Sequence, residues 1–283
     1  MKNLYGYDTD KNLISLSINF NGEVLAQNRY AYDRNGNRTI KQQLRGTTYY
    51  TYDSINQLIN VKYPDYEEQL FYDKAGNRSK RIVNDVTEHY LYDKRNRLIR
   101  QVFQKPTGTT AKHYIYDNAG NLMNDGERIY KNDAFNRVTR VETTTGQVQI
   151  NRYDAEGLRY EMEQNKKLVQ FIFNENREVV VEKSTDKFKR LIRSYDLWAS
   201  ECEPEKTWCH YASDEQGSIV FITDDNKVCN RYDYDAWGNL ITCEEIIPNR
   251  YLYTGQQFDQ ITQQYYLRAR YYNPVIARFT KED

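Results

Sequence analysis

Residues 72–78 read Tyr-Asp-Lys-Ala-Gly-Asn-Arg, and close copies of this stretch recur along the whole chain. Tyr-Asp pairs stand 20 residues apart at Tyr32-Asp33, Tyr52-Asp53, Tyr72-Asp73 and Tyr92-Asp93. The aspartate register continues, with small slips, at Asp117, Asp133, Asp154, Asp214 and Asp235. Self-similarity at a fixed period predicts a repeat architecture in which each period is one supersecondary unit.

Each repeated aspartate opens a turn. An Asp at the first turn position accepts hydrogen bonds from its own backbone two residues on, and Gly at the fourth position tolerates the positive φ that closes the loop. Asn takes the glycine position at Asn56, Asn96 and Asn136, and it is the next most tolerant residue there. The Asp and Gly pairs are Asp33 and Gly36, Asp73 and Gly76, Asp117 and Gly120, Asp154 and Gly157, and Asp235 and Gly238.

A second turn falls midway in each period, so each period is predicted to be one β-hairpin. These turns are Arg45-Gly46, Pro64-Asp65, Asn84-Asp85, Pro106-Thr107-Gly108, Asn124-Asp125-Gly126 and Thr145-Gly146. Two strands of about six to eight residues plus two turns fill a period, and at roughly 3.3 Å per residue each strand is about 20 to 25 Å long.

The composition favours a wall one sheet thick over a packed globule. The chain has 27 Tyr against 10 Phe and 3 Trp, and its mean hydropathy of -0.93 is very polar. Tyrosines two apart share one face of a strand, and stacked hairpins would line their rings into ladders that hold the sheet. We therefore interpret the repeated Tyr and Asp as scaffold and not as ligand contacts. The pairs are Tyr30/Tyr32, Tyr50/Tyr52, Tyr90/Tyr92, Tyr114/Tyr116 and Tyr251/Tyr253.

Charge and motif content exclude several functional classes. The chain has 40 Lys+Arg and 40 Asp+Glu, so it lacks the basic footprint of a nucleic-acid binder and indicates no acidic or membrane-surface partner. No segment is long and apolar enough to span a bilayer, and the first residues enter a repeat without a signal-peptide stretch. No cofactor is expected, because the three histidines lack a nucleophile signature and no Gly-rich phosphate loop occurs. Residues 8–12 resemble the opening of a calcium loop but are expected to be another Asp turn.

The repeated unit resembles the YD repeats of the Rhs family, which are shared by bacterial wall-associated proteins, toxin-complex C subunits and animal teneurins. The C-terminal third resembles the Rhs-associated core, and residues 214–218 match the turn that precedes it. The core motif residues are Tyr253, Gly255, Asp259, Tyr265, Tyr266, Arg268, Arg270, Tyr271, Tyr272, Pro274, Arg278 and Phe279. Two positions depart from the family pattern, because Asn273 stands for Asp and Ala277 for Gly, which puts local turn geometry in question.

The resemblance implies an all-β fold in which consecutive antiparallel hairpins form a curved or spiralling sheet, part of a cocoon-like shell. It divides the chain into a repeat array over 1–165 and the Rhs-associated core over 166–283. Its implied function is a structural, non-enzymatic segment that encloses or presents a C-terminal toxin domain, in a secreted or cell-surface protein. The implied partners are that toxin domain or the remainder of the shell, with a delivery apparatus or a cognate immunity protein as further partners. A partial wall leaves an open edge that must pair with other sequence, a partner or itself.

Two other functions are open at this point. Exposed tyrosine ladders would suit a glycan- or surface-binding adhesion module. An aspartyl autoprotease is the weakest alternative, because Asp283, which aligns with the aspartate that opens the family's self-cleavage segment, is at best half of such a site.

The four cysteines give three interpretations. Free buried thiols rank first, and disulfides between Cys202 and Cys209 and between Cys229 and Cys243, facing each other across hairpins, rank second. A zinc site from Cys202, Cys209 and His210 with one more ligand ranks third, because the gap between the cysteines is wider than ordinary ligand spacing.

Overall fold

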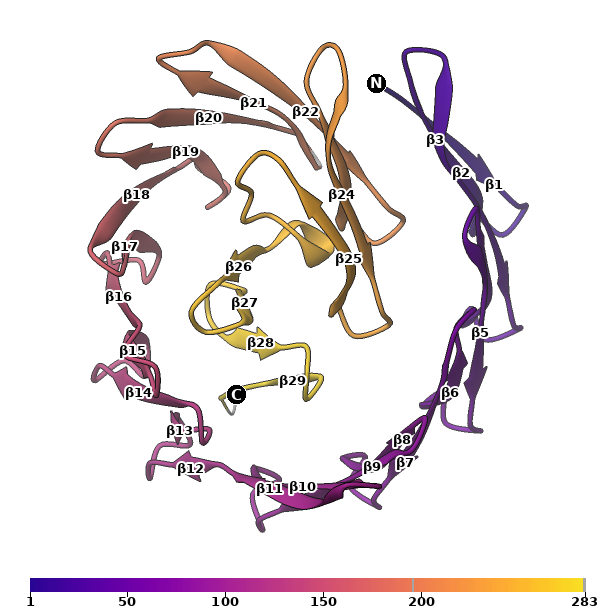
Figure 1. The fold of residues 1–283 in the computed structure, drawn as a ribbon, viewed down its shortest axis with the longest axis vertical. Coiled ribbons are helices and arrows are strands. Elements are labelled where there is room, and N and C mark those ends of the chain that lie inside the picture. The colour runs from indigo at the N-terminus through magenta and orange to yellow at the C-terminus, as the bar shows by residue number, and fades with distance from the viewer. Residues whose placement is uncertain (195, 282–283) are drawn as a thin grey trace. The chain divides into compact units, whose positions relative to one another are not determined.

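The computed structural model describes residues 1–194 and 196–281, which form two compact units, 1–114 and 115–283. The first unit is one curved antiparallel sheet of 11 strands, each paired only with its neighbours in sequence (Figure 1). Its strands are β1 (Lys2–Tyr7), β2 (Leu13–Phe20), β3 (Glu23–Tyr32), β4 (Arg38–Gln43), β5 (Gly46–Tyr52), β6 (Leu58–Lys62), β7 (Glu67–Tyr72), β8 (Arg78–Val83), β9 (Val86–Tyr92), β10 (Leu98–Lys105) and β11 (Gly108–His113).

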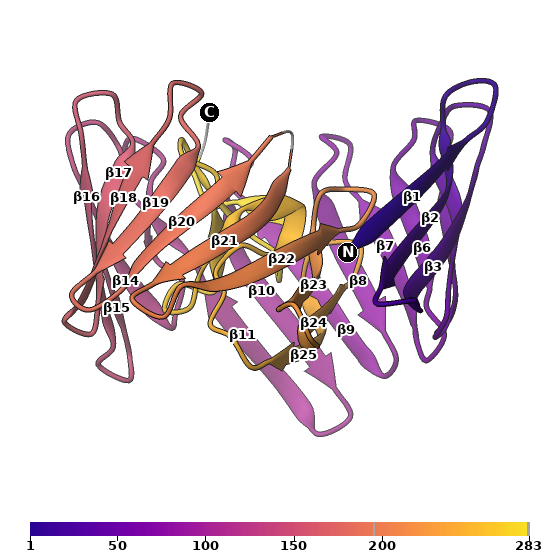
Figure 2. The same ribbon diagram turned by 90° about the horizontal axis from the view of Figure 1, so that it is seen from above.

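The second unit holds a 14-stranded sheet, here called the wall, in which strands again follow sequence order (Figures 1 and 2). The wall comprises β12 (Ile115–Tyr116), β13 (Leu122–Asn124), β14 (Arg128–Asn132), β15 (Val138–Thr143), β16 (Val148–Tyr153), β17 (Arg159–Gln164), β18 (Lys167–Phe173), β19 (Val179–Ser184), β20 (Phe188–Arg193), β21 (Leu197–Glu203), β22 (Thr207–Ser213), β23 (Ile219–Thr223), β24 (Val228–Tyr234) and β25 (Leu240–Glu245).

A 4-stranded sheet, here called the inner sheet, lies within the curve of the wall (Figure 1). It comprises β26 (Gln257–Asp259), β27 (Gln264–Tyr266), β28 (Tyr271–Asn273) and β29 (Arg278–Phe279), and a short 3-10 helix, η1 (Tyr253–Gly255), leads into it. The all-β prediction of consecutive antiparallel hairpins is confirmed. Within the described residues, no helix is long and apolar enough to cross a membrane.

The aspartate turns are built by side chain and backbone together. The Asp73 carboxylate accepts the backbone N–H of Ala75 at 2.8 Å and of Asn77 at 2.9 Å. Gly76 donates its N–H to the Asp73 carbonyl at 3.0 Å and has φ +80. Because the left-handed region is strained for residues with a Cβ, glycine suits this position. The carboxylates of Asp33, Asp53, Asp93, Asp133, Asp154, Asp214 and Asp235 accept the same pair of backbone N–H groups.

In six of the Tyr-Asp pairs the tyrosine fastens its turn to the preceding hairpin, in a contact we call the tyrosine clasp. The Tyr52 hydroxyl donates to the carbonyl of Arg38 at 3.0 Å, and the Tyr72 hydroxyl donates to the carbonyl of Leu58 at 2.7 Å. Each acceptor is the first residue of the strand that follows the preceding aspartate turn. Burial raises the pKa of Tyr72 to about 12, so its hydroxyl stays a donor at neutral pH. Tyr32, Tyr92, Tyr153 and Tyr234 make equivalent bonds to Leu13, Arg78, Val138 and Ile219.

One face of the first sheet carries buried polar groups that are linked from strand to strand. Arg81 of β8 pairs with Glu68 of β7 at 2.6 Å and with Glu88 of β9 at 3.1 Å. Gln101 of β10 donates to Glu88 at 2.9 Å, and the Tyr114 hydroxyl donates to Gln101 at 2.9 Å. Buried charges are tolerated when they are paired and hydrogen-bonded. The row lies beside buried apolar residues, because Val61 is opposite Glu68 and Leu70 is opposite Arg81.

Candidate functional site

The candidate functional site is the contact between the wall and the inner sheet, and at its centre is a group we call the inner anchor. The inner anchor consists of Arg159 at the start of β17, Gln257 and Asp259 on β26, Tyr266 on β27 and Tyr271 on β28. Arg159 follows directly after the Asp154 turn, so the repeat itself fixes the direction of this side chain. The inner sheet brings the other four residues to it from about a hundred positions later in the sequence.

Arg159 is held by four polar or aromatic side chains, and its own side chain is fully buried. Its guanidinium and the Asp259 carboxylate form two bonds, 2.5 Å and 3.0 Å long, and both side chains are 0% exposed. Arg159 also donates to the Gln257 side chain at 2.6 Å and to the Tyr271 hydroxyl at 3.0 Å. The Tyr266 ring lies 4.0 Å from the guanidinium carbon. A bidentate arginine–carboxylate pair adds geometric specificity to its energy, so the inner sheet is fixed in one register against the wall.

Within the inner anchor, the Arg159 guanidinium stays charged and the Tyr271 hydroxyl stays neutral. Burial alone would lower the pKa of Arg159, but Asp259 and the neighbouring tyrosine hydroxyls more than offset this and raise it well above its ordinary value. Burial raises the pKa of Tyr271 well above its usual range, so this hydroxyl remains protonated. Two wall side chains add hydrogen bonds to the partners of Arg159. The Gln149 amide donates to the Asp259 carboxylate at 2.8 Å, and the Asn151 amide donates to the Tyr271 hydroxyl at 3.1 Å.

A second contact lies at Glu182 of β19, which accepts the Tyr251 hydroxyl at 2.7 Å and pairs with Arg250 at 3.1 Å. Burial opposes ionisation of Glu182, yet the positive charges of Arg250 and Lys189 lower its pKa below the ordinary value. The carboxylate therefore stays ionised and ties the chain before η1 to the wall.

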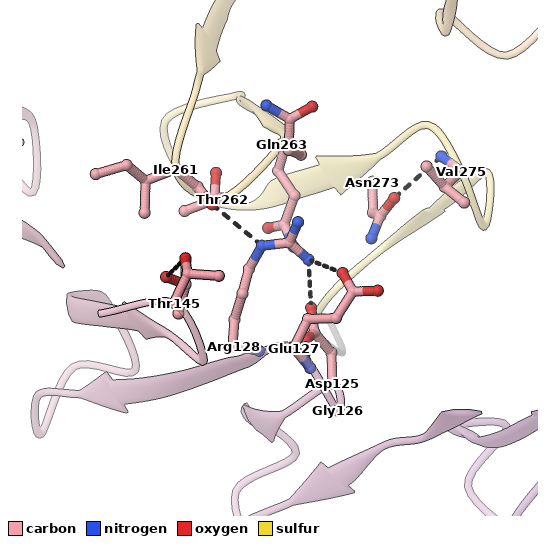
Figure 3. A network of polar contacts seen from close by, with 12 residues as sticks. Asp125, Gly126, Glu127, Arg128, Thr145, Ile261, Thr262, Gln263, Asn273 and Val275 are labelled. Atoms are coloured by element: carbon pink, nitrogen blue, oxygen red, sulfur yellow. Dashed lines mark hydrogen bonds and ion pairs between the residues drawn. The ribbon is translucent and has the colours of Figure 1, made fainter. Parts of the chain in front are cut away.

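A third contact is made by Arg128 of β14, drawn in Figure 3. Its Nε donates to the backbone carbonyl of Ile261 at 3.1 Å, while another nitrogen of the same guanidinium pairs with Asp125 and Glu127, each at 3.1 Å. The acidic residues orient the guanidinium, and the turn after β26 supplies the carbonyl. The wall is thus joined to the inner sheet and to the chain that leads into it at three separated positions.

The last aspartate turn, residues 235–239, is covered by rings of the C-terminal segment. The hydroxyls of Tyr265 and Tyr272 donate to the carbonyls of Gly238 and Trp237 at 2.8 Å and 2.9 Å. Gly238 has φ +89, and a Cβ added there would meet the Tyr253 ring at 2.5 Å. Glycine is required at this position by both its conformation and its neighbour.

The structure brings together only part of the predicted core motif. Asp259, Tyr266 and Tyr271 surround Arg159, and Tyr253, Tyr265 and Tyr272 cover the last turn. The other motif residues lie apart from the inner anchor. Gly255 ends η1, Arg268 precedes β28, Arg270 lies over the Phe279 ring at 3.8 Å, and Pro274 and Arg278 flank the final turn.

The predicted repeat turns are divided between the two units. The first unit contains Asp33, Gly36, Asp73 and Gly76, and the second contains Asp117, Gly120, Asp154, Gly157, Asp235 and Gly238.

The final turn forms despite its two departures from the family pattern. The Asn273 side chain accepts the backbone N–H of Val275 at 3.0 Å, and Ala277 donates its N–H to the Pro274 carbonyl at 3.3 Å. Ala277 has φ +51, in the region that glycine occupies with less strain. Asp283 lies outside the described residues.

Sequence reasoning missed Arg159, Arg128 and Glu182. Arg159 occupies the same repeat position as Arg38 and Arg78, directly after an aspartate turn, so the repeat contained a signal for a special arginine. No local pattern pointed to Asp259 as its partner, because the pairing joins segments far apart in the chain.

The cysteines do not face one another as the disulfide interpretation required. Cys202 is opposite Thr207, Cys209 opposite Ser200 and Cys243 opposite Tyr232, and all four thiols are free. The expectation that each pair faces across its hairpin is wrong, because the strand registers offset them. The first-ranked expectation of free thiols is therefore confirmed. The expected burial holds for Cys209 and Cys229, whereas Cys202 is half-buried and Cys243 is exposed.

The zinc interpretation is not supported either. His210 contacts Asp225 at 3.3 Å, and the described residues contain no group of three or more His, Cys, Asp and Glu side chains placed to hold a metal. Residues 8–12 form an aspartate turn, in which the Asp8 carboxylate accepts the N–H groups of Asp10 and Asn12.

The chain is similar in sequence to one protein family and to several known proteins. Residues 42–283 match the family model described as Teneurin YD-shell. The tRNA nuclease WapA of Bacillus subtilis (strain 168) is 34% identical over 182 residues, which is 59% of this chain and 8% of WapA. Salivary gland surface protein 1 of Aedes aegypti is 37% identical over 73 residues, which is 25% of this chain and 2% of that protein. The match thus spans less than a tenth of either relative.

Among solved structures, the TcdB2-TccC3-Cdc42 crystal structure aligns with a TM-score of 0.71 and 15% identity. The Photorhabdus luminescens Tc holotoxin pore aligns with a TM-score of 0.69 and 15% identity. Each alignment covers 99% of this chain and 17% of the other. At this identity the likeness is one of fold.

Replacing Gly238 by Ala should destabilise the chain more than replacing Gly36 by Ala. Both glycines have positive φ, +89 and +82, but nothing lies within 4 Å of a Cβ at Gly36. Gly36→Ala should cost about 1 kcal/mol of unfolding free energy, the strain of a left-handed residue with a Cβ. Gly238→Ala adds the clash with the Tyr253 ring. In a chain that already carries Tyr253→Ala, the added cost of Gly238→Ala should fall to about that of Gly36→Ala. Urea unfolding measures these variants, and equal losses at the two glycines would contradict the packing described.

Replacing Asp259 by Leu should reduce the unfolding free energy by about 3 to 5 kcal/mol, because it leaves Arg159 buried and unpaired. The matched control is Glu142→Leu, which breaks the exposed pair with Arg140 and should cost about 0 to 1 kcal/mol. The double change Arg159→Met with Asp259→Leu should recover part of the loss, since no unpaired charge remains. A double variant as unstable as Asp259→Leu would show that charge pairing is not the source of the effect.

Proposed function

The chain belongs to the Teneurin YD-shell family, and from that premise we propose that it is a wall segment of a shell that encloses or presents a C-terminal toxin domain. A structural shell role agrees with both the family and the fold of its neighbours. The finer statement, that the enclosed partner is a toxin, rests on the YD-repeat resemblance and on the nuclease name of WapA. That name describes the relative, whose nuclease activity is not assigned to this chain.

The observation that carries the proposal is the three-point attachment of residues 249–281 to the curved face of the wall. A sheet one layer thick needs no second layer to form, yet residues 249–281 are drawn onto its concave side by Arg159, Glu182 and Arg128. Such an attachment directs the chain that reaches Lys281 toward the inside of the wall, which is the side an enclosed domain must occupy.

A non-catalytic role is supported by what the recurring residues do. The repeated Asp, Gly and Tyr are used in turns and clasps, and Asp259 is used as a counter-ion. Within this segment we assign 1–165 as the repeat array and 166–283 as the Rhs-associated core. The partners we propose are the toxin domain or the remainder of the shell, with a delivery apparatus or immunity protein as further candidates.

The adhesion alternative has weaker support. The ladder tyrosines that would have to stack on sugars are largely buried, with Tyr30, Tyr50 and Tyr90 exposed by 6%, 9% and 5%. Sugar recognition by stacking needs an accessible ring face, so these rings favour the packing role.

Protease protection of an appended domain tests the proposal. A small, trypsin-sensitive reporter fused directly after Asp283 should be digested more slowly than the same reporter fused before Met1, because the C-terminal segment is attached to the concave side of the wall. Asp259→Leu, which loosens the inner sheet, should remove the protection, whereas Glu142→Leu should keep it. Equal digestion of the two fusions would contradict the enclosing role.

A further inference from the structure

Strand β1 has the residue pattern of a repeat strand but is paired on one side only within the described residues. It stands at the end of the 11-stranded sheet and pairs only with β2. Its turn is an ordinary aspartate turn, because the Asp8 carboxylate accepts the N–H groups of Asp10 and Asn12, each at 2.9 Å. It therefore corresponds to β3, β5, β7 and β9, each of which pairs with a strand on both sides.

Two tyrosines on β1 are more exposed than their counterparts, and one buried side-chain oxygen there has no partner. Tyr7 holds the clasp position, but it is 60% exposed and its hydroxyl bonds to none of the described residues. Tyr5 is 46% exposed, whereas its counterparts Tyr30 and Tyr50 are 6% and 9% exposed. The side-chain oxygen of Asn3 is buried without a hydrogen-bond partner. An unpaired strand edge is a template for another strand. On this edge, Tyr5 and Tyr7 are exposed and the Asn3 side-chain oxygen has no hydrogen-bond partner.

Strand β25 presents the complementary edge. It stands at the end of the wall and pairs only with β24. It begins at Leu240, directly after the aspartate turn of residues 235–239. Arg38 and Leu58 hold this same position on β4 and β6, and their carbonyls accept the clasps. The carbonyl of Leu240 thus stands where the repeat places a clasp acceptor.

We propose that β25 of a second copy of this chain pairs antiparallel with β1, so that copies join head to tail through a continuous sheet. The repeat fixes the register. In the pairs Ile40 with Tyr49 and Asn60 with Gln69, one residue lies two after the clasp acceptor and the other three before the clasp tyrosine. Transferring this register to the new junction sets Leu4 opposite Thr242, Asn3 opposite Cys243 and Lys2 opposite Glu244.

Charge and side-chain direction both agree with this register. Lys2 meets Glu244 with opposite charge, and opposite charges directly across a strand pair are stabilising. Asn3 shares its face with Tyr5, which pairs with the buried Leu16, and Cys243 shares its face with its partner Tyr232, which is also buried. The buried face of one sheet therefore continues into that of the next. Each copy offers both edges, so this heterologous contact gives rings if it closes and open chains if it does not.

Cysteine cross-linking tests the register. In Asn3→Cys the new thiol lies opposite the exposed Cys243 of the second copy, at the Cβ separation of directly paired residues that a disulfide spans. Mild oxidation with oxidised glutathione should give disulfide-linked multimers on a non-reducing gel. Leu4→Cys, which points to the other face, should not cross-link, and neither should Asn3→Cys combined with Cys243→Ser. Equal cross-linking by Leu4→Cys, or a disulfide formed only within single chains, would overturn the proposal.

Sedimentation equilibrium of the full chain tests the association itself. The wild type should show concentration-dependent multimers, and Tyr7→Phe should weaken association about fivefold through loss of one hydrogen bond. Tyr49→Phe, which alters an exposed ring on β5, should leave association unchanged. Lys2→Glu should weaken association, and adding Glu244→Lys should restore it. A wild type that stays monomeric at every attainable concentration, or a charge swap without rescue, would overturn the proposal.

Discussion

Each hairpin of this chain is held chiefly by the hairpins beside it, because strands pair only with their sequence neighbours. The tyrosine clasp is the side-chain contact that meets this constraint. It joins a tyrosine hydroxyl of one repeat to a backbone carbonyl of the repeat before it, so the bond forms only between two adjacent repeats. The aspartate turn positions the tyrosine at the strand end, and the period of the sequence is the distance between successive clasps. The recurrence of Tyr next to Asp thus follows from the need to fasten each turn to the last.

The same constraint explains why charged and amide groups are buried. A thin sheet offers little apolar volume, so its covered face relies on long side chains that satisfy one another, as Arg81 does between Glu68 and Glu88. The inner anchor applies this solution to a second layer. Arg159 is fully enclosed, and its ion pair contributes geometric definition, since a misplaced inner sheet would leave a buried charge without a partner. The C-terminal segment is therefore held in one position.

The sequence was most informative about local structure. The turns at Asp73 and Gly76 could be predicted because both interacting groups lie within a few residues of each other. The clasp acceptor of Tyr72 could not, because a carbonyl has no sequence signature. The pairing of Arg159 with Asp259 was also beyond reach, since it depends on how the inner sheet lies on the wall. The cysteine pairing failed for a related reason, because approximate symmetry about a turn does not fix the strand register, which sets Cys202 opposite Thr207 and Cys243 opposite Tyr232.

The clasp as a stabilising side-chain link between hairpins is tested most directly by urea unfolding of two matched double variants. Tyr52→Phe with Tyr72→Phe removes two clasp hydroxyls, and Tyr49→Phe with Tyr160→Phe removes two exposed ones. We predict that the first variant loses about 2 kcal/mol of unfolding free energy, about 1 kcal/mol for each hydrogen bond. The second should stay within about 0.5 kcal/mol of the wild type. Equal stability of the two variants would contradict the account.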